Sequence, residues 1–176
     1  SFGAVAALRL AIAAPEMGRT LTLIGPGLFA AVNGSEAWKA TLGMMAHYRA
    51  ALTEGDRERA AKTFTRVWGS GLAWSEISAN ERATIVKRIH LVEAGTPALF
   101  EDSGGILQPD ALESLEMPVL LIRGDRSPAI IQAITEAIAA RLPDVGVATV
   151  PGASHMVPIT HPGETAGLIG VNLDRG

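Results

Sequence analysis

Residues 117–125 read Met-Pro-Val-Leu-Leu-Ile-Arg-Gly-Asp, an apolar run that starts after a proline and stops at a glycine. A continuous apolar run between turn signals is typical of a strand buried on both faces of a sheet. Residues 128–138 follow with isoleucines at helical spacing, and residues 145–150 form a second strand-like run. Strand, helix and strand in this order predict parallel strands joined by a crossover helix.

The residues upstream extend the same pattern. Residues 3–14 are almost all apolar helix formers, which predicts a helix buried on all sides. Residues 20–24 read as a short strand, and Gly25-Pro26-Gly27 ends it. A last helix is expected from Pro162 to near Val171. Because only a few strands are visible, one edge of the sheet would stay unpaired, so we expect further strands upstream of Ser1.

Residues 33–100 differ in composition from the rest of the chain. Charged residues appear, and apolar residues follow helical spacing from 35 to 52, from 56 to 68 and from 78 onward. We therefore predict an α/β core, residues 1–32 and 101–176, with a helical insertion at residues 33–100. All three tryptophans lie in the insertion: Trp38, Trp68 and Trp74.

The overall composition limits the class of function. The chain has 176 residues, 48% of them hydrophobic, a formal net charge of −3 and no basic stripe, which argues against nucleic-acid binding. With no cysteine, disulfides, thiolate catalysis and cysteine-based metal sites are excluded, and a reducing cytoplasm is the expected location. The apolar stretch 5–14 is too short to cross a membrane. Metal-ligand spacing and phosphate- or dinucleotide-binding glycine loops are also missing, so we expect no cofactor and no metal.

Two short motifs carry the chemistry. Ser1-Phe2-Gly3-Ala4 resembles the Ser-x-Gly half of the nucleophile elbow Gly-x-Ser-x-Gly, and a predicted helix follows it at once. Near the other end, Gly152-Ala-Ser-His155-Met-Val-Pro158 follows the last predicted strand. Together with Asp125 these residues give the chain order Ser…Asp…His. In both motifs and in this order the chain resembles the C-terminal part of an α/β-hydrolase, from the nucleophile onward, with a helical cap inserted at 33–100.

The resemblance implies a role for each of these residues. Ser1 would attack a carbonyl carbon, His155 would take its proton, and the N–H of Phe2 would stabilise the oxyanion. The second oxyanion donor would come from a loop outside this chain. The family commonly places the acid at the position of Ser127, and some members place it at that of Gly25. Neither is acidic here, so Asp125 is the nearest candidate.

Each of these readings has a plainer alternative. Asp125 could serve only to cap a turn. The tryptophans could line an apolar substrate pocket or form the insertion's own small core. We read His47 and His90 as surface or packed residues, and His161 as the start of the last helix.

Three functional hypotheses follow. The first is a serine hydrolase that cleaves a small-molecule ester, or a related acyl or carbon–carbon bond, with the tryptophans shaping the substrate pocket. The second is a non-catalytic, hydrolase-like fragment that acts as a binding or assembly module. The third keeps the enzyme but completes the sheet with a companion chain or with a missing N-terminal half. The sequence does not name the substrate.

Overall fold

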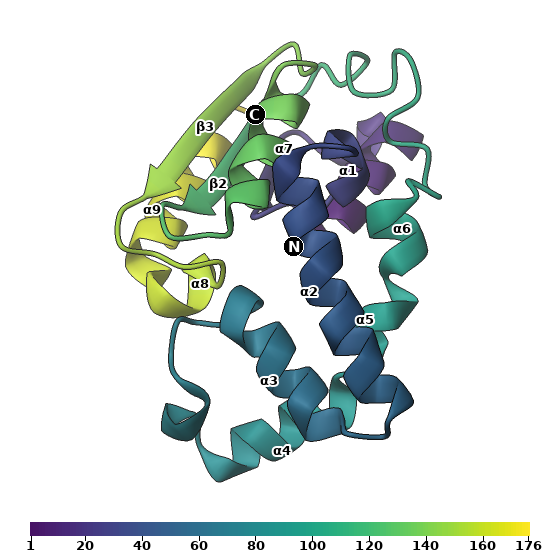
Figure 1. Ribbon diagram of the computed structural model, residues 1–176. Helices are drawn as coiled ribbons and strands as arrows, with labels where there is room; N and C mark the ends of the chain where they lie inside the picture. The colour runs from purple at the N-terminus through teal and green to yellow at the C-terminus, as the bar shows by residue number, and fades with distance from the viewer.

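Three parallel strands form the sheet of the protein, a computed structural model that describes residues 1–176 (Figure 1). The strands are β1 (Leu21–Ile24), β2 (Val119–Gly124) and β3 (Val145–Val150), in the spatial order β1-β2-β3. Both interfaces are parallel, as the alternation of strands and helices predicts. Because β2 lies in the centre, it is the most completely buried strand, and β1 and β3 are edges.

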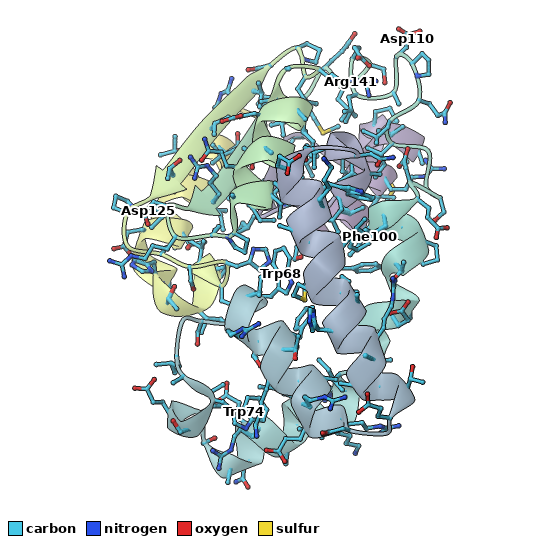
Figure 2. All side chains as sticks on the ribbon, in the orientation of Figure 1. Trp68, Trp74, Phe100, Asp110, Asp125 and Arg141 are labelled. Atoms are coloured by element: carbon cyan, nitrogen blue, oxygen red, sulfur yellow. The ribbon has the colours of Figure 1, made fainter.

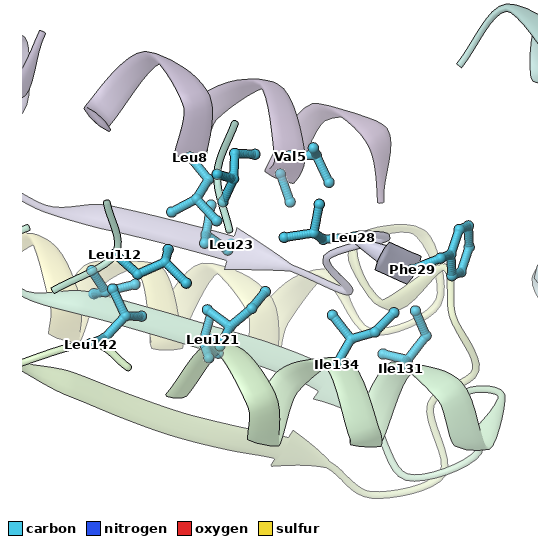
Figure 3. Close-up of a cluster of buried hydrophobic side chains, with 14 of the residues drawn as sticks. Val5, Leu8, Leu23, Leu28, Phe29, Leu112, Leu121, Ile131, Ile134 and Leu142 are labelled. Carbon is cyan, nitrogen blue, oxygen red and sulfur yellow. The ribbon is translucent and has the colours of Figure 1, made fainter. Parts of the chain in front are cut away.

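Helices cover both faces of the sheet. On one face, α1 (Phe2–Ala13) and α7 (Ala129–Ala139) pack over β1 and β2 and bury the main apolar cluster (Figure 3). On the other face, α8 (Val157–Thr160) and α9 (Pro162–Leu173) pack against a smaller cluster from β2 and β3. No helix combines the length and the apolar character needed to cross a bilayer.

Helix α1 departs from the expectation that it is buried on all sides. Val5 and Leu8 are buried against the sheet, whereas the Phe2 and Leu10 side chains are 52% and 51% exposed. One face of α1 packs on the sheet, and on the rest of the helix Phe2 lies against Gly95 and Arg9 against Gly104, while Leu10 stays in solvent. The apolar composition of α1 therefore exceeds what the packing within residues 1–176 uses.

The residues between the first and second strands form a separate helical segment. Its helices are α2 (Glu36–Thr53), α3 (Arg57–Trp68), α4 (Ala79–Arg88), α5 (Leu91–Ala94) and α6 (Thr96–Phe100). The side chains of Ser35, Asp56 and Ser78 cap the first three helices at their N-termini, which explains why the helices start there. Below, "helical segment" means residues 36–100.

The helical segment has an apolar core of its own. Tyr48 is fully buried in it and donates a hydrogen bond of 2.7 Å to the Ile89 carbonyl oxygen. The sequence patterns do not predict three short helices, because each is too short to show periodicity. They are α5 and α6 of the helical segment and α8 after β3. Short 3-10 helices are Pro15–Met17, Phe29–Val32 and Trp74–Glu76.

The carboxyl ends of the strands bring three loops to one edge of the sheet. Gly25, after β1, donates its N–H to Ile122 O at 2.8 Å, and Asp125, after β2, donates its N–H to Val150 O at 3.1 Å. Gly124 lies so close to the loop after β3 that a Cβ atom there would come within 2.5 Å of two carbonyl oxygens. A residue with a side chain would push this loop away, and the loop carries His155.

Candidate active site

Ser1 lies at the N-terminus of α1, beside the loop after β1. Its backbone nitrogen donates to Ile24 O at 2.9 Å, and its carbonyl oxygen accepts from Gly27 N at 3.5 Å. A Cβ atom on Gly27 would lie 3.0 Å from Ser1 Oγ. The missing side chain at Gly27 therefore lets the loop approach the Ser1 hydroxyl closely, while the serine itself stays exposed.

Phe2 is the first residue of α1, immediately after Ser1. The first N–H groups of an α-helix have no intrahelical acceptor, and they carry the positive end of the helix dipole. The N–H of Phe2 is therefore free to donate to an anionic oxygen beside Ser1. This is the position that the sequence predicts for one oxyanion donor.

His155 is buried in the loop after β3, with 6% of its surface exposed. A Cβ atom on Gly25 would lie 2.9 Å from His155 Cε1 and 3.1 Å from Nδ1, so the imidazole rests directly on this glycine. On another side, the indole of Trp68 meets the imidazole edge to face, with ring centroids 5.1 Å apart and an interplanar angle of 74°. Burial lowers the pKa of His155 from its ordinary value of 6.5 to about 4. The imidazole is therefore neutral at physiological pH, the form a general base needs.

The loop Gly25–Gly27 brings the two side chains to the same place. Gly25 contacts His155, and Gly27, two residues later, contacts Ser1. No hydrogen bond joins Ser1 Oγ to His155 in this structure. Catalytic hydrogen bonds are often loose before substrate binds, so this arrangement is compatible with a serine and its base.

Asp125 makes no hydrogen bond to His155. Its side chain is exposed and makes no hydrogen bond, and Figure 2 shows it at the periphery of the molecule. The buried Nδ1 atom of His155 has no hydrogen-bond partner, and neither has the buried Oγ of Ser127. The structure thus brings Ser1 and His155 to one loop but leaves Asp125 in solvent, and its role as the acid stays a prediction from sequence order.

A cavity of about 400 Å³ opens beside Ser1, between α1 and the helical segment. Of the three tryptophans, Trp68 lines it, whereas Trp38 and Trp74 do not. Trp38 packs on the main core and Trp74 on the core of the helical segment. No charged side chain contributes to the wall, whose only polar side chains are Ser1 and Thr41. The lining residues are Ser1, Phe2, Phe29, Thr41, Met45, Phe64, Trp68, Leu91, Val92, Ala94, Gly95, Leu99 and Phe100.

Sequence reasoning did not anticipate two parts of this site. Gly25 and Gly27 were read as the end of a strand, and Gly25 also as a position where the acid is absent, but neither was read as a contact of the site, although a Gly-Pro-Gly turn beside a catalytic loop also signals close backbone approach. The cavity residues of α2, α5 and α6 carry no motif, because a lining position and a core position look alike in sequence. No cluster of histidine, aspartate or glutamate suited to hold a metal ion occurs in the structure.

Comparison with known proteins places the chain in a family. The profile described as "Alpha/beta hydrolase family" matches residues 1–168. The chain belongs to the α/β-hydrolase family. Among curated proteins, none matches the sequence significantly.

Solved structures show the same fold at low sequence identity. Carboxylesterase CesB of Bacillus subtilis has 18% identity and a TM-score of 0.68, over 100% of this chain and 58% of that protein. The protein ALR0039 of Nostoc sp. PCC 7120 has 20% identity and a TM-score of 0.69, over 98% of this chain and 64% of its own. An α/β hydrolase of Sphaerobacter thermophilus has 21% identity and a TM-score of 0.55, over 96% of this chain and 65% of its own.

This chain spans less than two thirds of the length of those similar structures. The three-stranded sheet with its helices is accordingly part of an α/β-hydrolase fold.

Proposed function

We propose that this hydrolase is a serine hydrolase that cleaves an ester, or a related acyl or carbon–carbon bond, of an uncharged and mainly apolar small molecule. Ser1 Oγ attacks the carbonyl carbon, and neutral His155 accepts the hydroxyl proton. The N–H of Phe2 donates to the oxyanion. His155 then returns the proton to the leaving group, and water releases the acyl group from Ser1 by the same steps.

One observation carries this proposal. The loop Gly25–Gly27 contacts His155 at one end and Ser1 at the other, and the apolar cavity opens at Ser1. A charged substrate group would lose its hydration in a cavity without charged side chains, which disfavours it strongly. We therefore assign the cavity to the apolar part of the substrate and the helical segment to the role of a cap over it.

Ester turnover by single-residue variants tests the two catalytic roles. We expect Ser1→Ala and His155→Gln each to abolish hydrolysis of p-nitrophenyl butyrate, because each removes one member of a cooperating pair. The loss should be at least about 10³-fold. Undiminished hydrolysis by Ser1→Ala would refute the assignment of the nucleophile.

The substrate site needs the rest of the hydrolase fold around it. We propose that an N-terminal half, or a companion chain, supplies a strand beside β1 and the second oxyanion donor. The hydrogen bond from Ser1 N to Ile24 O supports this proposal, because it lies on the side of β1 that faces away from β2. Because the chain has no cysteine, we expect the enzyme to work in the cytoplasm.

A second candidate function is a binding or assembly module without catalysis. The exposed apolar residues of α1 and the free edge of β1 favour it, because such surfaces mark interfaces. Reaction of Ser1 with a serine-specific inhibitor distinguishes the two functions, since a pure binding module does not activate a serine.

A further inference from the structure

His155 is fixed by contacts on several sides, and none of them is a carboxylate. Gly25 lies against the imidazole, and a Cβ atom on this glycine would come within 2.9 Å of His155 Cε1. The indole of Trp68 packs edge to face against the imidazole. Because only 6% of His155 is exposed and these two neighbours contact its ring, the ring has little room to turn. The Nδ1 atom, through which a carboxylate usually orients a catalytic histidine, is buried without a hydrogen-bond partner in this structure.

Trp68 is itself held firmly. Its ring packs against Phe29, with centroids 5.5 Å apart, and against Phe64, with centroids 6.4 Å apart. It is the last residue of α3, and only 6% of it is exposed. A side chain fixed by aromatic neighbours on two sides makes a rigid wall for a third ring.

The neighbouring residues join the same two parts of the chain. Ser154 Oγ donates a hydrogen bond of 3.2 Å to the carbonyl oxygen of Gly69, immediately after α3. The pairs 68–155 and 69–154 therefore tie the end of α3 to the loop after β3. The helical segment thus contacts the loop of the base directly, besides lining the cavity.

We propose that Trp68 and Gly25 are positioning residues that hold His155 for catalysis by packing, so that the site works as a Ser1–His155 pair without an orienting carboxylate. This inference rests on the proposed serine-hydrolase function. It makes α3 part of the catalytic apparatus: Trp68 fixes the ring from the helical segment, and Gly25 leaves the ring its place against β1. Asp125 then has no role in orienting the base.

Turnover of p-nitrophenyl acetate by Trp68 variants tests the inference, because an acetyl group is too short to need the deep cavity. For Trp68→Leu we expect kcat to fall by about 10²-fold, the cost of misplacing a catalytic group, with KM changed less than about threefold. Trp68→Phe, which keeps an aromatic edge against His155, should recover most of kcat. Trp74→Leu, a tryptophan of the helical segment outside the cavity, is the matched control for folding.

Asp125→Asn supplies the contrary result. If Asp125 orients His155, kcat falls by up to about 10⁴-fold, which overturns the inference. If packing orients the ring, kcat changes by less than about threefold, in line with an exposed carboxylate without a partner. Unchanged kcat in Trp68→Leu also overturns it.

A readout without turnover separates this inference from the proposed function. In nitrogen-15 spectra of the imidazole, His155 should show one tautomer in the wild type and averaged tautomers in Trp68→Leu. If wild-type ester turnover is absent but these spectra differ as expected, the proposed function fails and the positioning stands. If the spectra are identical, the positioning fails whatever the turnover.

Discussion

At the scale of single residues, burial of His155 has a cost that depends on pH. The folded pKa of about 4 lies below the ordinary value of 6.5, so the unfolded chain binds a proton more readily. The stability due to the neutral ring is therefore complete above pH 6.5 and is lost as pH falls towards 4. We expect the free energy of unfolding to drop by about 2 kcal/mol between pH 7.5 and pH 5 from this residue alone.

Urea unfolding at both pH values measures this dependence. The His155→Gln variant has no titrating ring, so its free energy of unfolding should change about 2 kcal/mol less than that of the wild type. Equal pH dependence of wild type and variant would mean that His155 is not buried as described.

Gly25 permits a second test at this scale. It has a φ of +52°, and a Cβ atom there would meet the imidazole. We expect Gly25→Ala to lose about 1–2 kcal/mol of stability through its positive φ and to lose ester turnover through displacement of His155.

Gly34 is the matched control for that variant. Its φ is +83°, but a Cβ atom there would meet nothing within 4 Å. Gly34→Ala should therefore show a similar loss of stability and normal turnover, as measured by thermal melts and initial rates. If both variants hydrolyse esters equally well, Gly25 does not position the base.

At the scale of elements, α2 presents one of two adjacent methionines to the cavity. Met45 lines it, whereas Met44 faces the neighbouring groove toward α7. We expect Met45→Trp to reduce hydrolysis of p-nitrophenyl decanoate relative to the acetate by at least about tenfold, because the larger ring shortens the space for the acyl chain.

Met44→Trp should leave this ratio unchanged, because the same enlargement lies outside the cavity. If Met45→Trp fails to fold, Met45→Ala tests the same point with the opposite sign, since it lengthens the space and should favour the longer ester. If the wild type, the Met44 variant and the Met45 variant all show the same preference for acyl chain length, the acyl chain lies elsewhere.

The elements also show what sequence patterns capture. The three strands and the starts of α2, α3 and α4 follow from apolar runs and capping residues, and the structure confirms them. Contact between Trp68 and His155 was beyond prediction, because it joins residues 87 positions apart through the packing of α3 on a loop. Sequence order suggested Asp125 as the acid. It could not predict that the Asp125 side chain is exposed, because that exposure depends on how the turn after β2 bends.

At the scale of the whole molecule, the sheet has an unpaired edge. Leu21 N and Gly25 N bond to the β2 side, so the N–H of Thr22, between them in the alternation, points away from β2. We expect the isolated chain to self-associate along this edge, with a mass by light scattering above the 18.3 kDa of one chain.

Thr22→Pro removes an outward donor without breaking the bonds of β1 to β2. This variant should shift the population toward the monomer, because proline cannot continue an added strand. A wild-type chain that stays monomeric at high concentration would contradict an open edge.

The fold class could be predicted from the order of strands and helices, and the profile match over residues 1–168 confirms it. That the chain forms only part of such a fold could also be predicted, because a sheet of three strands leaves edges that need a further strand or a cover. The cavity was not, because it arises where α1, α2, α3, α5 and α6 converge, and no local pattern records that convergence.

The central claim is that Ser1 is an activated nucleophile, and labelling by a fluorophosphonate probe tests it most directly. The probe reacts only with a serine whose proton is removed and whose oxyanion is stabilised. We predict that the probe modifies the wild-type protein at Ser1, located by mass spectrometry of the peptides, and that Ser1→Ala and His155→Gln do not react. Equal labelling of Ser1→Ala, or no labelling of the wild type in the presence of the strands that we propose beside β1, would contradict the account.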